Sequence, residues 1–148
     1  MSSYLKTRVN QLEKTVLMLD FFQYRMNILM MPVHEVIYML KCDKLYKDLV
    51  FLNTCIDLIQ AGSDFPEAWE KSVYESKLKL KEEEKNKLIS FGKCIGKTDT
   101  ENQKKTVELF RDYFIRQSEY AKDERKKYAA PIMIISFMIG FAVFILII

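Results

Sequence analysis

The segment that comes nearest to a catalytic motif runs from Gly92 to Thr98 and has the sequence Gly-Lys-Cys-Ile-Gly-Lys-Thr. A phosphate-binding P-loop has four residues between its first glycine and the closing Gly-Lys-Thr, and it follows a buried strand. This segment has three residues there and follows a charged, helix-type stretch. The missing residue removes one backbone amide from the nest that would hold the phosphates. The pattern instead predicts a helix that ends at Gly96 and another that is capped by Thr98 and Glu101.

Other residue types that perform chemistry are isolated along the chain. His34 is the only histidine, and it stands beside Glu35 without a serine or cysteine in a matching pattern. Asp99 and Glu101 lie at a predicted helix N-terminus, where carboxylates stabilise the helix dipole without any catalytic role. We therefore expect no catalytic site, no metal, no cofactor and no small-molecule substrate.

The cysteines indicate the compartment more than any chemistry. Cys42, Cys55 and Cys94 are odd in number, form no CxxC pair and stand among apolar residues typical of helices. This pattern predicts buried free thiols in a reducing compartment.

The composition predicts an all-α fold. Four glycines and three prolines in 148 residues are too few for a β-sandwich or barrel, which needs frequent turns. The formal charge of +3 gives neither half the character of a nucleic-acid-binding arm.

The C-terminal run 129–148 contains no charged residue. As a helix its 20 residues would span about 30 Å, the thickness of a bilayer's hydrocarbon core. The sequence thus predicts a transmembrane helix over 129–148 and a helical bundle domain over 1–128; a buried helix of a globular protein is the alternative. We expect these side chains, among others, to contact lipid: Ile132, Phe137, Phe141, Phe144 and Ile148.

A basic segment comes directly before this run. Arg125, Lys126 and Lys127 are consecutive cations, and Tyr128 follows them. Cations beside a transmembrane helix favour the cytosolic side, and tyrosine favours the headgroup level. We therefore expect the 1–128 domain to be cytosolic.

The remaining pattern predicts about six helices. The first runs from Ser2 or Ser3 to about Met30, and apolar residues repeat along it at helical spacing: Leu5, Val9, Leu12, Val16, Leu19, Phe22, Met26 and Leu29. Additional apolar residues widen this stripe toward a buried face: Leu17, Phe21 and Ile28. A long bundle helix is favoured over a dimeric coiled coil, because the heptad spacing is broken.

Capping residues, glycine and proline mark the predicted ends of the helices in the rest of the domain. Pro32 begins a short helix to about Lys41, and Asp43 caps a third helix that ends at Gly62. Asp64 caps a fourth helix, in which Trp69 is expected to anchor the core. The alternating charges from Lys77 to Lys87 predict the solvated face of a fifth helix.

The sixth helix follows Thr98. Val107, Phe110 and Phe114 are expected to face inward, and its polar last turns to form a stalk that holds the bundle off the membrane.

Taken together, these residues resemble the stage III sporulation protein AB family. The resemblance covers almost the whole chain: the long first helix, Pro32 and Glu35, Ala68-Trp69-Glu70, and the basic stretch before the apolar end. Its densest part is similar to the family's Gly-x-x-x-Gly-x-Ser-Asp-x-x-x-Gln pattern, with Thr98 in place of serine: Gly92, Gly96, Lys97, Thr98, Asp99 and Gln103. Family members usually begin with a further transmembrane helix, so either the chain is shortened or this member has one anchor.

The resemblance implies a non-catalytic role. The family is similar to a reduced inner-membrane platform protein of type II secretion and type IV pilus machines. It implies a place in the mother-cell membrane around the forespore, where the chain would dock a secretion-type ATPase, stage III sporulation protein AA, to a channel with other sporulation components. The six residues of the dense pattern are the expected partner-binding site, or else they fix the turn between two helices. The rival hypothesis is a tail-anchored structural protein that self-associates through the stripe of its first helix.

Overall fold

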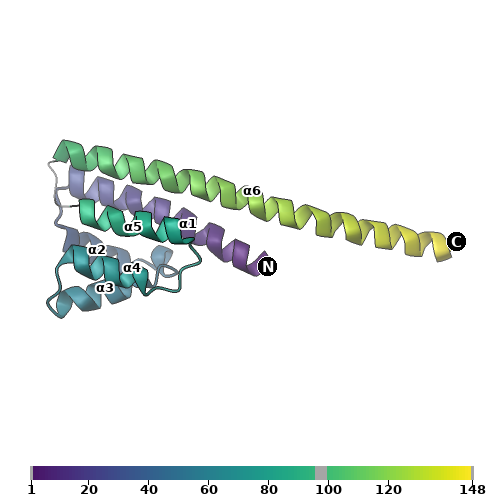
Figure 1. The fold of residues 1–148 in the computed structure, drawn as a ribbon, viewed down its shortest axis with the longest axis horizontal. Helices are drawn as coiled ribbons and strands as arrows, with labels where there is room; N and C mark the ends of the chain where they lie inside the picture. Colours follow the sequence, from purple (N-terminus) through teal and green to yellow (C-terminus); the bar gives the residue numbers. More distant parts are fainter. Residues whose placement is uncertain (1, 96–99, 148) are drawn as a thin grey trace.

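The computed structural model describes residues 2–95 and 100–147, and the regular secondary structure in this part of the chain consists of helices joined by short connections. The elements are labelled in Figure 1 and have these bounds: α1 Ser2–Gln23, η1 Tyr24–Ile28, α2 Val33–Cys42, η2 Lys44–Tyr46, α3 Phe51–Gln60, α4 Phe65–Tyr74, α5 Glu82–Cys94 and α6 Thr100–Ile147. Here η1 is one turn of π-helix and η2 is one turn of 3₁₀-helix. The prediction of an all-α fold is confirmed.

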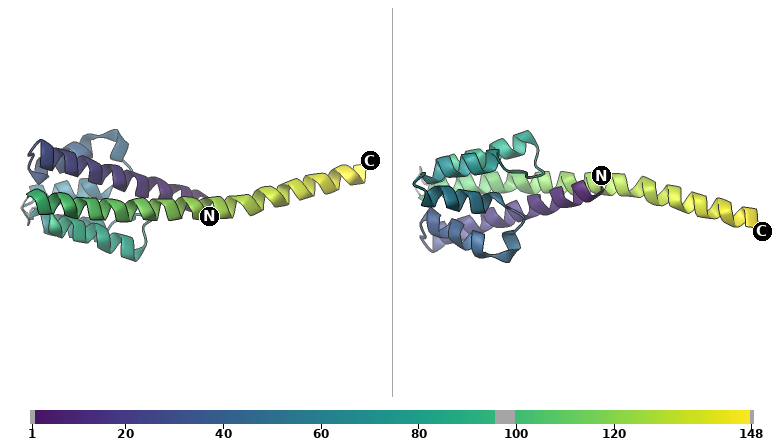
Figure 2. Two further views of the ribbon diagram at one scale, coloured as in Figure 1. Left: turned by 90° about the horizontal axis from the view of Figure 1, so that it is seen from above. Right: turned by 90° about the horizontal axis from the view of Figure 1, so that it is seen from below.

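Two long antiparallel helices, α1 and α6, form the spine of the molecule (Figure 1). α5 lies along this pair, and the three ten-residue helices α2, α3 and α4 pack on the other side of α1 and α5. Beyond the N-terminus of α1, α6 continues without helical neighbours (Figure 2). We call the end of the bundle that holds η1 and the start of α6 the tip, because it is the end farthest from the C-terminus.

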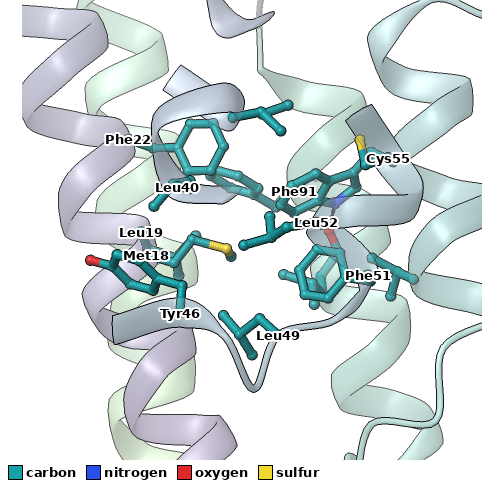
Figure 3. Close-up of a cluster of buried hydrophobic side chains, with 14 of the residues drawn as sticks. Met18, Leu19, Phe22, Leu40, Tyr46, Leu49, Phe51, Leu52, Cys55 and Phe91 are labelled. Carbon is teal, nitrogen blue, oxygen red and sulfur yellow. Dashed lines mark hydrogen bonds between the residues drawn. The ribbon is translucent and has the colours of Figure 1, made fainter. Parts of the chain in front are cut away.

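The core is centred on Trp69, as the sequence predicts. Its indole ring is fully buried and meets the rings of Phe22 and Phe91 at centroid distances of 5.8 Å each and that of Phe51 at 5.1 Å. The buried indole N–H donates to the Leu88 carbonyl oxygen at 2.7 Å, so its polar atom is satisfied. Side chains from α1, α2, α3 and α5 close around this centre (Figure 3).

Several helix ends follow their predicted signals. The Asp64 carboxylate accepts the backbone N–H of Glu67 at 3.2 Å and caps α4. Gly62 has a φ of 110°, and the Ser63 N–H donates to the Leu58 carbonyl at 3.0 Å, which is the Schellman arrangement. Val107 and Phe114 are buried and Phe110 is partly buried against the core, as expected of the sixth helix.

The first helix does not run regularly to Met30. α1 ends at Gln23, and the chain continues as the π-helical turn η1, in which the Leu29 N–H donates to the Tyr24 carbonyl. From Leu5 to Phe22 the stripe is buried, mostly against α6 and the core, except that Val16 is only partly buried. Leu17 and Ile28, which were expected to widen the buried face, are exposed instead.

The predicted third helix is interrupted. Asp43 caps only the short turn η2, by accepting the Leu45 N–H at 2.9 Å, and α3 begins at Phe51. Tyr46 and Cys55 are both buried, although in one continuous helix they would point about 180° apart. The break allows both side chains to enter the core.

The segment 75–81 is not the start of a solvated fifth helix, which the sequence predicted from Lys77. Leu78 and Leu80 are both buried while Lys79 between them is exposed, and residues two apart point the same way only in an extended chain. The Lys79 N–H donates to Gln11 Oε1 at 2.7 Å, so α1 supplies the hydrogen bonds that a helix would supply internally. We call this segment the strap.

The predicted membrane span over 129–148 is not confirmed by the structure. Within the residues that it describes, no helix meets the length and apolarity needed to cross a bilayer.

The predicted burial of the three thiols is confirmed only in part. Cys55 is buried, but Cys94 is half-buried and Cys42 is exposed.

Candidate docking surface at the tip

The expected partner-binding residues begin at Gly92, which the structure places in the interior. Gly92 is buried in α5, where a Cβ atom would lie 2.2 Å from Cδ1 and 2.6 Å from Cγ of Trp69. No rigid ring can approach a real Cβ so closely, so the glycine leaves the space that the indole occupies. Gly92 therefore has a packing role, and its interior position gives a partner no access.

Of the rest of the expected set, the structure describes only Gln103. Gly96, Lys97, Thr98 and Asp99 are outside the described residues, and so is the capping box that involves Thr98. Gln103 is half-buried on the first turns of α6, and among the described residues its amide nitrogen has no hydrogen-bond partner. Partner binding by this set stays a prediction.

An exposed apolar surface covers the tip where α1 ends. Ile28 is 67% exposed and Met30 is 70% exposed, and Tyr24 and Leu29 beside them are about half exposed. Monomeric proteins seldom leave contiguous large apolar side chains in water, and where they do, the surface often binds a partner. We call these four residues the tip patch.

The backbone beneath the tip patch is irregular. η1 is a π-helical turn, and Met30 has a φ of 55°, a left-handed conformation that is strained for a residue with a side chain. The buried side-chain amide of Asn27 has no hydrogen-bond partner at either its oxygen or its nitrogen among the described residues. π-Helical turns and strained residues cost free energy relative to regular helix, and they occur frequently at functional sites.

An apolar groove lies between α2 and α3 next to this turn. It has a volume of about 410 Å³ and these lining residues: Met31, His34, Glu35, Tyr38, Met39, Ile56, Ile59 and Gln60. His34 and Glu35 are exposed on its rim, so the pair considered for catalysis borders an apolar surface. Methionine and aromatic side chains make such a surface adaptable to a partner.

Sequence reasoning missed the tip patch because it assigned Ile28 and Leu29 to the buried face of the first helix and gave Tyr24 and Met30 no role. A stripe that continues past the point where neighbouring helices end must become exposed. The one available signal was the proline at position 32, which ends the helix while the apolar run is still in progress.

The buried ionisable groups are occupied by structural interactions. Arg8 and Glu84, 3% and 1% exposed, form a bidentate ion pair at 2.5 and 2.6 Å, and Arg8 also donates to the Lys79 carbonyl at 3.2 Å. The hydrogen bond to Glu84 raises the pKa of Arg8 above its ordinary value. Burial raises the pKa of the Cys55 thiol to about 12, partly offset by a hydrogen bond with Ser72. Neither group is poised for acid–base chemistry near neutral pH.

The expected membrane contacts are on the part of α6 that extends past the bundle. Phe137, Phe141 and Phe144 are exposed, whereas the side chain of Ile132 and all of Ile148 lie outside the described residues. The basic segment from Arg125 to Tyr128 is exposed as well.

The chain matches the family model of stage III sporulation protein AB over residues 1–148. It belongs to the stage III sporulation protein AB family. No curated protein and no solved structure matches it. Membership in this family connects the chain with sporulation, and the all-helical bundle described above is the structure of a family member.

Proposed function

We propose that this chain is a non-catalytic adaptor of the channel between mother cell and forespore. The apolar end of α6 anchors it in the mother-cell membrane, and the tip docks the secretion-type ATPase, stage III sporulation protein AA. The observation that carries the proposal is the position of two exposed apolar surfaces at opposite ends of one molecule: the tip patch and the free end of α6. A protein that bridges a membrane and a partner needs this arrangement.

The composition of the free end of α6 supports the anchor. From 129 to 148 the sequence carries no charge, and all the described side chains from 137 to 147 are exposed. The transfer of each large apolar side chain from water to an apolar environment is favourable by about 1.5–3 kcal/mol. A lipid bilayer provides that environment, and the cations at 125–127 match the cytosolic flank of an anchor.

The filled interior supports a role without catalysis. The buried ionisable groups belong to packing and to one ion pair, and among the described residues no three metal-binding side chains gather in one place. The rival hypothesis of self-association has less support, because the stripe that would mediate it is buried in the chain's own bundle from Leu5 to Phe22.

The test is binding of the full chain, in lipid nanodiscs, to the sporulation ATPase of the same organism. Ile28→Ser together with Met30→Ser should weaken binding at least tenfold, because both side chains lie on the tip patch. The matched control is Tyr74→Ser with Tyr120→Ser, two exposed aromatic residues near the strap and near the Glu13–Lys122 pair, away from the end of α1. Melting temperatures must show that both double variants are folded.

A second arm tests the predicted turn. Charge reversal at Lys97 and Asp99 should weaken binding if the interface extends across the α5–α6 connection. ATPase binding that is unaffected by the tip-patch changes would contradict the proposed surface, and the absence of any binding would contradict the adaptor function.

A further inference from the structure

A groove between the start of α1 and the part of α6 around Lys122 and Arg125 is rich in positive charge. It has a volume of about 620 Å³ and is bordered by side chains of α1, of the segment 47–50 and of α6. Its lining includes the following cations: Lys6, Lys47, Lys122 and Arg125. We call it the basic groove.

The two carboxylates in the groove are already engaged. Glu13 pairs with Lys122 at 3.1 Å, and Asp48 accepts a hydrogen bond from the Asn10 side chain at 2.7 Å. Among the described residues, Lys6, Lys47 and Arg125 form no ion pair. The groove therefore keeps a net positive charge and three cationic groups able to donate to an anion.

The register of the two long helices places the groove beside the free end of α6. The Glu13–Lys122 pair sets α1 and α6 side by side in opposite directions. Lys6 lies seven residues before Glu13, and residue 129 lies seven residues after Lys122, so the two positions are level. Arg125 is one helical turn, about 6 Å, from the point where the charge-free run begins.

We propose that the basic groove binds the headgroup of an anionic phospholipid in the membrane that holds α6. The inference rests on the proposed anchoring of that helix. Once the run from 129 onward is in the bilayer, the ammonium groups of Lys6 and Lys47 and the guanidinium of Arg125 face the layer of phosphate groups. Lipid phosphates are anions held at that height, whereas a dissolved anion has no such fixed position.

The groove also differs from a simple basic tail. Lys126 and Lys127 are exposed on one helix and attract any anionic surface. In the groove, cationic side chains from three separate segments line one concave surface. Such a surface can select a headgroup by its shape, and binding there would fix the rotation of the bundle about the axis of α6.

The experiment measures acetylation of individual lysines in the full chain by an N-hydroxysuccinimide ester, mapped by mass spectrometry. The chain is reconstituted in vesicles of phosphatidylcholine alone or with one third phosphatidylglycerol. We expect Lys6 and Lys47 to react at least fivefold more slowly when phosphatidylglycerol is present. Lys104 and Lys105, exposed residues on the first turns of α6 at the tip, are internal controls whose rates should not change.

Two charge-reversed variants separate the groove from general surface attraction. Lys47→Glu should return the rate at Lys6 to its value in phosphatidylcholine, whereas Lys44→Glu, an exposed neighbour outside the groove, should leave the protection intact. Equal protection of Lys6 in both variants would overturn the inference.

Further outcomes distinguish the lipid from other sources of phosphate. Equal protection by millimolar inorganic phosphate in phosphatidylcholine vesicles would show a free-anion site and overturn the lipid assignment. If the protein binds the vesicles but the acetylation rate of Lys6 is the same with and without phosphatidylglycerol, headgroup binding in the groove is overturned while the membrane anchor is supported. Failure of the chain to float with either vesicle would overturn the anchor itself.

Discussion

Gly92 and Trp69 share one space between α4 and α5. The indole occupies the volume in which any other residue at position 92 would place its Cβ atom, and its N–H reaches the Leu88 carbonyl one turn earlier on the same helix. Because the ring is enclosed by Phe22, Phe51 and Phe91, it has no room to retreat. A residue of the family pattern is therefore explained by packing, without a partner.

Gly92→Ala should consequently destabilise the fold. In an open helix this change stabilises by about 0.5–1 kcal/mol, but here the overpacking against Trp69 should lower the free energy of unfolding by about 1–3 kcal/mol. Chemical denaturation of the full chain in detergent measures the difference. Gly140→Ala is the matched control, because a Cβ there meets nothing within 4 Å, and equal effects at both positions would contradict the packing role.

The thiols of Cys42 and Cys55 should differ in reactivity. At pH 8 iodoacetamide should modify Cys42, which is exposed, and leave Cys55 intact. Burial raises the pKa of Cys55 from 9.0 to about 12, which lowers its thiolate fraction about 1000-fold, and only the thiolate reacts. Mass spectrometry of the labelled chain checks this, and rapid labelling of Cys55 without unfolding would contradict its burial.

The same shift gives a dependence on pH. The neutral thiol is favoured by folding, so its contribution to stability is complete below pH 9 and is lost as the pH rises from 9 toward 12. Between pH 9 and 12 the free energy of unfolding should decrease with pH in both the unmodified chain and Cys55→Ala. The decrease should be steeper in the unmodified chain, by up to about 1.4 kcal/mol per pH unit.

At the scale of elements, the Arg8–Glu84 pair connects three segments. Arg8 from α1 holds Glu84 of α5 and the Lys79 carbonyl of the strap, and the Lys81 N–H donates to Glu84 at 3.0 Å. The strap has few internal hydrogen bonds, so its conformation depends on these contacts. One polar network thus fixes where α5 begins.

Removing one partner of this pair should be more harmful than removing both. Glu84→Gln leaves the Arg8 cation buried without its counter-charge, and we expect a loss of about 3–5 kcal/mol in unfolding free energy. Arg8→Met combined with Glu84→Met should lose clearly less than the sum of the two single changes. The exposed Glu82→Gln, in the same turn of α5, should change stability by no more than about 0.5 kcal/mol. Additive effects in the double-mutant cycle would disprove the coupling.

Most elements could be predicted because local signals determine them. Asp64 marks the start of α4, Gly62 follows the end of α3, and the apolar stripe identifies the buried face of α1 as far as Phe22. The strap could not be predicted, because its conformation depends on Gln11 and Arg8, about 70 residues away in sequence. A run of charged residues predicts a solvent-exposed helix face. Only the tertiary structure reveals that Glu84 pairs with a buried arginine.

The candidate docking surface was harder to predict than the fold. A stripe of apolar residues does not say where its neighbours stop, so Ile28 could not be distinguished from a core residue by spacing alone. Of the residues predicted from the family pattern, Gln103 lies at the same end of the molecule as the tip patch, on the first turns of α6. The contact residues themselves depend on how α1 ends.

At the scale of the whole molecule, the free end of α6 is the proposed membrane anchor. If it spans the membrane, a charge near its middle should prevent stable insertion, since one lysine there opposes insertion by about 2.5–3.5 kcal/mol. Met138→Lys with Ile139→Lys should therefore move the chain from the membrane fraction to the alkaline-carbonate extract. Leu109→Lys, on the bundle part of α6, should not. Membrane retention of the double variant would refute the anchor.

The same helix that begins at the tip also forms the free end. α6 has 48 residues and a length of about 72 Å, with no connecting loop between the bundle and its last turn. Mechanically it is a lever whose two arms are continuous. A load applied at the tip is carried along one helix to the far arm, and Pro131, which cannot donate a backbone hydrogen bond, marks the place where that helix can bend. Under the proposed function, the partner at the tip and the membrane at the far arm would be connected by a single helix with one hinge.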